Sequence, residues 1–324
     1  MQSLRCATRG ERRANLPSGR VLSNAVEPRA LQALRPALLY AGNKCTYGAV
    51  LTRVGPPDWS RLDWVEPFVG SGGLLLSAPH CRGYVVSDVN PDVVDLLRFT
   101  RDNCAELTQA VERLFKADNN EPSTYLALRS EFNAAPRGLY KSALFVYLNR
   151  HGFNGLVRYN AAGALNVGFG KRVRPHCPTA ELVATSRLLQ RRQVEIAECD
   201  FEQALADVRN RSVVLLDSPY LPANGKAKTS GIYRCGAFTE AQQERLGLVA
   251  AALARDGHYV IAFNYSSPKA RAIHSGASEL HELSVGTRIS RTAAGRGKVA
   301  ELVAVYRPAI KVRAAEKQAA RPRS

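Results

Sequence analysis

No run of apolar residues in this chain approaches the length of about 18 that a membrane-spanning helix needs. The N-terminal segment contains arginines but lacks the apolar core of a secretory signal peptide. The seven cysteines are odd in number and contain no C-x-x-C pair, which predicts neither a disulfide framework nor a metal site. We therefore expect a soluble, cytoplasmic protein that makes no contact with a membrane.

Acidic residues are scarce beside basic ones, 28 against 45, and the formal net charge is +17. Such a surplus attracts polyanions, so nucleic acid is the leading expected partner. Residues 1–36 hold seven basic and two acidic groups, and residues 307–324 hold six and one. We predict a disordered basic extension over 1–36 and a basic tail over 311–324. Solvated ends without a partner are the alternative interpretation.

Strand-like apolar runs alternate with helical spacing along the chain, which predicts an α/β fold with a largely parallel sheet. The expected strands are 62–68, 84–89, 194–200, 212–220 and 258–264. The clearest expected helices are 91–103 and 239–257, the second with Thr239 as N-cap and Gly257 at its end. A terminal strand pair, 279–285 and 300–308, is expected to flank a flexible basic loop.

About 105 residues separate the second and third expected strands, far more than an ordinary crossover requires. We predict an inserted subdomain over 108–193, helical at first and then folded into a hairpin with Gly163 in its turn. The main α/β domain, into which this subdomain is inserted, would comprise 37–107 and 194–310. Between residues 137 and 174 the chain has seven basic and no acidic residues, mixed with aromatics and amides. This mixture favours contact with nucleic acid over a merely solvated face.

A glycine-rich turn, VEPFVGSGG at 65–73, follows the first expected strand and precedes a helix-like segment. Glycines there let the backbone approach a ligand at the carboxyl end of the sheet. Asp88 ends the next strand, where a carboxylate can accept hydrogen bonds from both ribose hydroxyls. The alternative is that Asp88 caps the helix that starts at Pro91.

The segment Asp217-Ser218-Pro219-Tyr220 ends a strand and places a carboxylate, a peptide carbonyl and an aromatic ring side by side. Adenine N6 is a poor nucleophile because its lone pair is delocalised into the ring. Two acceptors for the N6 hydrogens, the Asp217 carboxylate and the Ser218 carbonyl, would favour a pyramidal nitrogen while the base stacks on Tyr220. Such a base must first be flipped out of the duplex.

With these motifs in this order, the chain resembles the Dam-type DNA adenine-N6 methyltransferases over about 265 residues. LLYAGNK (38–44), EPFVGSG (66–72), VVSDVN (85–90), CDF (199–201), DSPY (217–220) and SRTAAGRGKVAELVAVY (290–306) are similar to the family's motifs. YLNRHGFNGLVRYNAAGALNVGFG (147–170) resembles its DNA-recognition hairpin. The resemblance implies a Rossmann-like S-adenosylmethionine-dependent methyltransferase sheet with an inserted recognition subdomain.

The resemblance also implies roles for individual residues. Lys44 would lie near the carboxylate of S-adenosylmethionine, Asp88 on its ribose, and Asp200 and Phe201 around its adenine. The full expected cofactor set is Tyr40, Lys44, Glu66, Phe68, Gly70, Gly72, Asp88, Asp200 and Phe201. The alternatives are a surface charge for Lys44, core packing for Phe201 and a helix cap for Asp200.

The expected partner is double-stranded DNA, bound by a bacterial or phage-encoded monomer. Phe153 and Asn154 would help fill the space of the flipped adenine, Leu156 would touch a thymine methyl, and Arg158 would bind a guanine bidentately. These residues keep the pattern associated with GATC. The expected DNA-binding set is Phe153, Asn154, Leu156, Arg158, Tyr159, Asn160, Lys171, Arg172 and Arg174.

Four positions depart from the family pattern. Ser218 replaces the first proline of DPPY, Asn43 replaces a glycine, Leu39 stands where a lysine usually contacts the outer guanine, and Gly168 replaces a proline. Ser218 still offers a carbonyl and, because it precedes Pro219, stays biased toward extended backbone. We expect site-specific adenine methylation, with a catalytically weakened or inactive DNA-binding homologue as the alternative. Cytosine-N4 methylation is disfavoured by Asp217, because serine is more common there in that chemistry.

Overall fold

The computed structural model describes residues 20–22, 34–40, 42–206, 208, 210–220, 238–286 and 298–309. Most of the expected basic extension, the tail 311–324 and the basic loop before Lys298 lie outside these residues. Arg20–Leu22, within the extension predicted to be disordered, forms a strand of the sheet, so the prediction is wrong for these residues. Within them, no helix is both long and apolar enough to cross a membrane.

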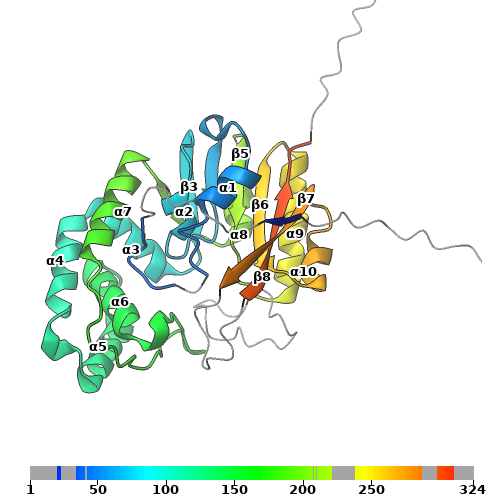
Figure 1. Cartoon of the computed structure of the whole chain (residues 1–324). Helices are drawn as coiled ribbons and strands as arrows, with labels where there is room; N and C mark the ends of the chain where they lie inside the picture. Colours follow the sequence, from blue (N-terminus) through cyan, green and yellow to red (C-terminus); the bar gives the residue numbers. More distant parts are fainter. Residues whose placement is uncertain are drawn as a thin grey trace, which may run out of the picture.

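A single twisted sheet organises the described chain (Figure 1). Its strand order is β1-β7-β8-β6-β5-β2-β3-β4, with β8 antiparallel to both neighbours and the other pairings parallel. The strands are β1 Arg20–Leu22, β2 Asp63–Glu66, β3 Gly83–Asp88, β4 Glu195–Glu198, β5 Ser212–Leu216, β6 Tyr259–Tyr265, β7 Glu279–Gly286 and β8 Lys298–Tyr306. The predicted Rossmann-like α/β fold and the terminal strand pair are confirmed.

Helices follow the strands in the alternation that a parallel sheet requires. The α-helices are α1 Gly48–Val54, α2 Gly73–Ser77, α3 Pro91–Asp102, α4 Cys104–Leu114, α5 Pro122–Ala134, α6 Leu139–His151, α7 Thr179–Arg191, α8 Phe201–Ala206, α9 Glu240–Arg255 and α10 Pro268–Ile273. In the part of the chain that the structure describes, the short 3-10 helices are η1 Trp59–Arg61, η2 Ala117–Asn119 and η3 Phe153–Gly155. Thr239 caps α9 as predicted, through a capping box with Gln242.

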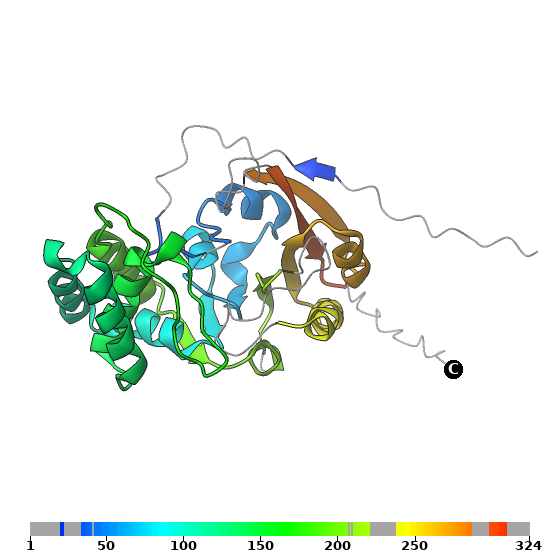
Figure 2. The same cartoon turned by 90° about the horizontal axis from the view of Figure 1, so that it is seen from below.

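Four helices, α4 to α7, separate β3 and α3 from β4 and lie together beside the sheet (Figures 1 and 2). Helix α4 begins at Cys104, earlier than the predicted subdomain boundary. Arg137 in this region bridges to the rest of the chain, with Nη2 2.6 Å from Asp95 Oδ1 on α3 and 2.6 Å from Glu198 Oε2 on β4. The division into domains stays a prediction.

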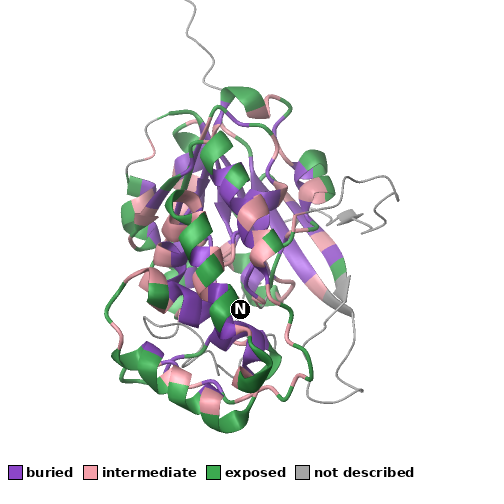
Figure 3. Cartoon of the chain, turned by 90° about the vertical axis from the view of Figure 1, so that its left-hand side faces the viewer, coloured by how far each residue is buried: buried purple, intermediate pink, exposed green. Residues whose placement is uncertain are grey.

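The core lies between the sheet and its helices, and Figure 3 shows the buried residues concentrated there. Strand β5 is buried along its whole length, as expected of a central strand covered on both faces. Helix α6 is also buried along nearly all of its length, although it sits among the added helices. The carboxyl ends of β2, β3 and β5 meet at one edge of this packed sheet, where the candidate site lies.

Candidate functional site

Acidic side chains collect at the carboxyl edge of the sheet. Glu66 and Asp88 are the last residues of β2 and β3, and Asp217 follows β5 directly. Because these strands are parallel neighbours, their ends share one edge. Glu301 reaches the same edge from β8, which runs the other way and pairs Glu301 with Tyr265 at the end of β6.

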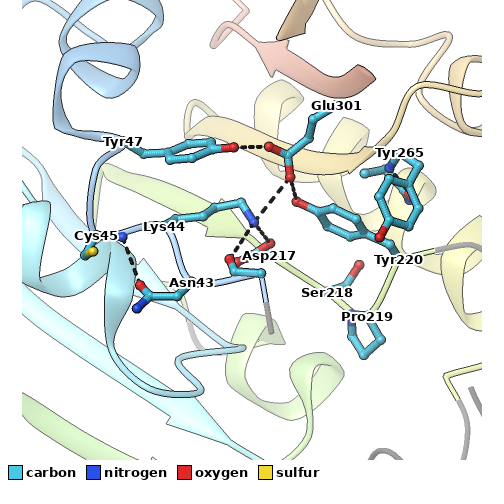
Figure 4. Close-up of polar contacts among 12 residues, drawn as sticks. Asn43, Lys44, Cys45, Tyr47, Asp217, Ser218, Pro219, Tyr220, Tyr265 and Glu301 are labelled. Carbon is cyan, nitrogen blue, oxygen red and sulfur yellow. Dashed lines mark hydrogen bonds and ion pairs between the residues drawn. The ribbon is translucent and has the colours of Figure 1, made fainter. Parts of the chain in front are cut away.

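Lys44 lies at the centre of this acidic group and is 2% exposed. Its Nζ is 2.7 Å from Asp217 Oδ1 and 3.4 Å from Glu301 Oε1 (Figure 4). Burial lowers the pKa of Lys44, but the attraction of the two carboxylates outweighs burial and the pKa is raised. Lys44 is therefore a buried cation held between two anions, which excludes the surface-charge interpretation.

Glu301 joins Lys44 to two tyrosines. The hydroxyl of Tyr47 donates to Glu301 Oε2 and the hydroxyl of Tyr220 donates to Oε1 (Figure 4). The ring of Tyr220 also meets the ring of Tyr265 edge to face, with centroids 5.0 Å apart. These contacts fix the ring on which the flipped base is expected to stack.

The Asp217 carboxylate lies beside this network and faces two opposing influences. Burial raises its pKa, the Lys44 ammonium lowers it, and the pKa stays above the ordinary value of an aspartate. Lys44 nevertheless provides the positive charge that stabilises the ionised form of Asp217. A carboxylate with a neighbouring peptide carbonyl can accept two hydrogens from one amino group.

Asp88 ties the glycine-rich turn to β3. Its Oδ2 accepts the Gly70 N–H at 2.9 Å and its Oδ1 accepts the Asn90 N–H at 2.9 Å. Asn90, not Asp88, caps α3 by accepting the Asp92 N–H, so the capping interpretation of Asp88 is wrong. Burial raises the pKa of Asp88.

The turn itself needs glycine at two positions, since Gly70 has φ +49° and Gly72 has φ +79°. A Cβ at Gly70 would lie 3.2 Å from the ring of Tyr40, which shows how closely that ring approaches the turn. Tyr40, Gly70 and Asp88 thus lie together, as the expected cofactor set requires. Backbone N–H groups, a carboxylate and aromatic rings in such proximity fit a nucleoside with its ribose.

Glu66 is buried next to these residues and accepts the indole N–H of Trp64 at 2.9 Å. Burial, with smaller contributions from Asp217 and Asp88, raises the pKa of Glu66 to about 8. Glu66 is therefore largely protonated at neutral pH and can donate a hydrogen bond as well as accept one.

Phe68 and Phe201 stack with ring centroids 5.6 Å apart. Phe201 is 5% exposed and belongs to the core, as its alternative interpretation held. Asp200 is exposed, and its Oδ1 accepts the Gln203 N–H, so it acts as a cap for α8. The cap occupies one carboxylate oxygen, and contact of Asp200 and Phe201 with a cofactor stays a prediction.

The segment after α6 carries the expected base contacts. Phe153 is 46% exposed and Asn154 is exposed with φ +54°, a conformation that asparagine tolerates better than most residues. Leu156 and Arg158 alternate with buried Val157, so they share the outer face as expected. Contact of these residues with DNA stays a prediction.

Bonds from Arg158 and a tight turn shape the hairpin around that face. The Arg158 guanidinium donates to Asn166 Oδ1 at 2.9 Å and to the Asn166 carbonyl at 3.0 Å, across the predicted hairpin. The hairpin is present as a turn with Gly163 at φ +73°, and isolated bridges replace continuous strands.

Tyr159 was expected among the DNA contacts, and this prediction is wrong. The residue is 1% exposed, and its hydroxyl donates to Asp92 Oδ2 at 2.8 Å and accepts from Asn90 Nδ2 at 3.3 Å. It anchors the hairpin to α3, because a buried hydroxyl needs partners of this kind. Asn160 is exposed and its Oδ1 accepts the N–H groups of Ala162 and Ala164, which shapes the turn.

Lys171 and Arg174 are exposed, and Arg172 is half-buried with Nη1 3.4 Å from the Arg150 carbonyl. They follow the hairpin on a separate stretch of chain. This arrangement suits contacts to a phosphate backbone better than contacts to bases.

Helix α6 joins the hairpin segment to the residues before Lys44. The side chain of Asn149 accepts the Leu39 N–H at 2.7 Å and donates to the carbonyls of Leu39 and Gly155, each at 2.8 Å. Arg150 Nε donates to the Ala37 carbonyl at 2.7 Å. Leu39 also packs on Gly155, where a Cβ would lie 2.4 Å from the leucine Cβ.

Sequence reasoning missed Glu301, Tyr47 and Gln243. Glu301 had a signal, since it is the one charged residue in the apolar run VAELVAVY of β8. A charge inside a buried strand needs a partner, and this partner is Lys44. Tyr47 and Gln243 carry no comparable signal.

Known proteins are similar to this chain over most of its length. A profile described as D12 class N6 adenine-specific DNA methyltransferase matches residues 40–287. A DNA adenine methylase of Salmonella typhimurium is 34% identical over 247 residues, which are 76% of this chain and 87% of that protein. A DNA adenine methylase of Vibrio cholerae is 32% identical over 275 residues, 85% and 96% of the two chains. One of Haemophilus influenzae is 32% identical over 274 residues, 84% and 93%.

Proposed function

This chain belongs to the D12 class of N6 adenine-specific DNA methyltransferases, and from that membership we propose that it moves a methyl group from S-adenosylmethionine to adenine in double-stranded DNA, within GATC or a related site. Adenine-specific DNA methylation is the activity of the class. We further propose the identity of the methyl donor, the double-stranded form of the DNA substrate and the DNA sequence that is recognised.

The observation that carries the proposal is the place of Asp217. It follows the buried strand β5, with the Ser218 carbonyl next along the chain and the Tyr220 ring held by Glu301. An adenine that stacked on Tyr220 could give one N6 hydrogen to Asp217 and the other to the carbonyl of Ser218. The nitrogen lone pair would then leave the plane of the ring and become available for attack.

S-adenosylmethionine supplies an electrophilic methyl group on a sulfonium when it is bound. Asp88 would hold the ribose, while Gly70 lets the backbone come close and Tyr40 covers the turn. Burial raises the pKa of Asp217, and Lys44 opposes this by charge and hydrogen bonding, so it favours the anionic form. Lys44 is buried, and Asp88 and Asp217 are partly buried, which reduces their contact with water and strengthens their polar interactions with the substrates.

The test is incubation with isotopically labelled S-adenosylmethionine and plasmid DNA, followed by nucleoside analysis and sequencing of the modified positions. Label in N6-methyladenine within one short sequence context supports the proposal. Label in another base, or no label with correctly folded protein, contradicts it. Single-stranded DNA of the same sequence serves as the comparison for the duplex requirement.

Asp88→Ala is expected to weaken donor binding. The loss of one partner from a buried polar arrangement costs about 1 to 3 kcal/mol, which corresponds to a dissociation constant about 5 to 150 times higher. Calorimetric titration with S-adenosylmethionine measures it. Asp118→Ala, which changes an exposed aspartate in η2, is the matched control. An Asp88 variant with the dissociation constant of the control would remove Asp88 from the donor site.

Arg158→Ala is expected to relax discrimination at one base pair of the site by about 1 to 3 kcal/mol, because a bidentate contact to guanine O6 and N7 is lost. Sequencing of methylated sites in DNA treated with either form measures the change. Lys171→Ala is the contrasting variant. It should weaken binding to all sequences and reduce the salt dependence of binding by about one unit of slope.

The assignment of Arg158 to base reading depends on the pattern of loss. If Arg158→Ala keeps the site preference of the parent and loses affinity alone, Arg158 contacts the backbone. Methylation by the parent outside any GATC-like context would contradict the expected site itself.

The proposal includes a monomer in the bacterial cytoplasm, where its DNA substrate is. One chain carries both the Asp217 segment and the basic hairpin region, so a second copy is not needed to complete the site. The relatives named above are bacterial proteins.

A further inference from the structure

Ser218, the departure from the family's double proline, has a specific partner in α9. It is 2% exposed, and its Oγ lies 3.1 Å from Nε2 of Gln243, which is 1% exposed. The same Nε2 donates to the carbonyl of Pro219. One buried amide therefore contacts two successive residues of the Asp217–Tyr220 segment.

Asn264 on β6 fixes the orientation of that amide. Its Nδ2 donates to Gln243 Oε1 at 3.0 Å, and its own Oδ1 accepts the Tyr265 N–H at 2.9 Å. Because Oε1 of Gln243 accepts from Asn264, the Nε2 end must face Ser218 and Pro219. The three side chains form a buried relay from the central strand β6 to the segment that follows β5.

A relay of buried polar side chains risks destabilising the fold. Buried amides and hydroxyls destabilise a protein when they lack partners, and apolar side chains would fill the same space without that risk. The relay satisfies its members and at the same time removes freedom from Ser218. A proline at 218 would fix φ through its ring, whereas serine is restricted only by the proline that follows it.

We propose that Gln243 is a positioning residue for methyl transfer and that the Ser218 hydroxyl is the group by which it holds the Asp217–Tyr220 segment. The bond replaces the rigidity that a second proline would provide, and so keeps the Ser218 carbonyl and the Tyr220 ring aligned with the Asp217 carboxylate. The inference rests on the proposed function, because the alignment matters for an amine substrate.

The test compares Ser218→Ala, Ser218→Pro and Gln243→Met in steady-state kinetics with the DNA and donor above. Ser218→Ala should lower kcat about 5- to 20-fold, with KM for both substrates changed less than about threefold, since misalignment affects the reacting geometry more than binding. Ser218→Pro should recover at least about half of the parent kcat, although it also lacks the hydroxyl. Gln109→Met, an exposed change on α4, is the control.

A double-variant cycle keeps the inference testable if Ser218→Pro folds poorly. Residues that act through one bond are not additive, so Ser218→Ala should cost less than about twofold in the Gln243→Met background. Thermal unfolding checks that each variant is folded. Independent, additive losses would overturn the inference, as would parent-like kcat in Ser218→Ala. Failure of the proposed function is a different result, namely no N6-methyladenine from the parent protein.

Discussion

Asp217→Ala is expected to lower kcat for adenine methylation by about 10²- to 10⁴-fold while donor binding changes little. The carboxylate acts on the acceptor amine, so its loss removes an interaction that matters most in the transition state. Single-turnover transfer of a labelled methyl group measures the chemical step, and calorimetry measures donor affinity. Lys44 retains Glu301 as a counter-charge in the variant, which favours correct folding.

Two further variants of this chain serve as controls for the Asp217→Ala result. Asp118→Ala controls for the loss of an aspartate and should keep the parent rate, since its side chain is exposed on η2. Asp217→Asn keeps the shape but turns one acceptor into a donor, and should also lose most activity. Near-parent turnover by either Asp217 variant would end the assignment of this carboxylate to the amine.

Lys44→Met is expected to destabilise the protein by about 3 to 5 kcal/mol at neutral pH, because it leaves buried carboxylates without their cation. Urea unfolding monitored by circular dichroism measures the change. Lys116→Met, at an exposed position before η2, is the control and should change stability by less than about 0.5 kcal/mol. Parent-like stability of Lys44→Met would mean that the network adds nothing to the fold.

The pH dependence of the Lys44→Met effect has a defined sign. Burial already raises the pKa of Asp217, and loss of the ammonium raises it further. A group with a raised folded-state pKa contributes its full stability below its unfolded value, near pH 4, and loses it as pH rises through the folded value. The difference between parent and Lys44→Met should therefore be small near pH 4 and grow toward neutral pH.

Much of the sheet could be predicted from local pattern. Strand β5 is a continuous apolar run that ends at Asp217, and α9 begins at a Thr239 capping box, so short stretches of sequence determine both. The glycine-rich turn could also be predicted, because Gly70 and Gly72 have positive φ, which glycine adopts more readily than other residues. These features depend on neighbours within a few residues.

The rest depended on contacts between distant segments. Tyr159 looks like an exposed aromatic in a basic segment, but Asp92 and Asn90, far away in sequence, bury it. Asp88 and Asn90 both precede α3; the Asn90 side chain caps the helix by accepting the Asp92 N–H, while the Asp88 carboxylate accepts the N–H of distant Gly70. The role of Glu301 can be recognised only from its contacts with Lys44 and Tyr220, which are distant from it in the sequence.

The Asn149 side chain, which holds Leu39 on one side and Gly155 on the other, has a consequence for attempts to engineer this enzyme. Leu39 is five residues from Lys44, and Gly155 lies between Asn154 and Leu156. If the hairpin reads the sequence as proposed, a change that moves it should also displace the residues just before Lys44, the ion-pair partner of Asp217. On the roles proposed above, we expect selectivity and turnover to depend together on Asn149 in α6, so a library aimed at new target sites should leave Asn149 intact and be screened for rate and preference together.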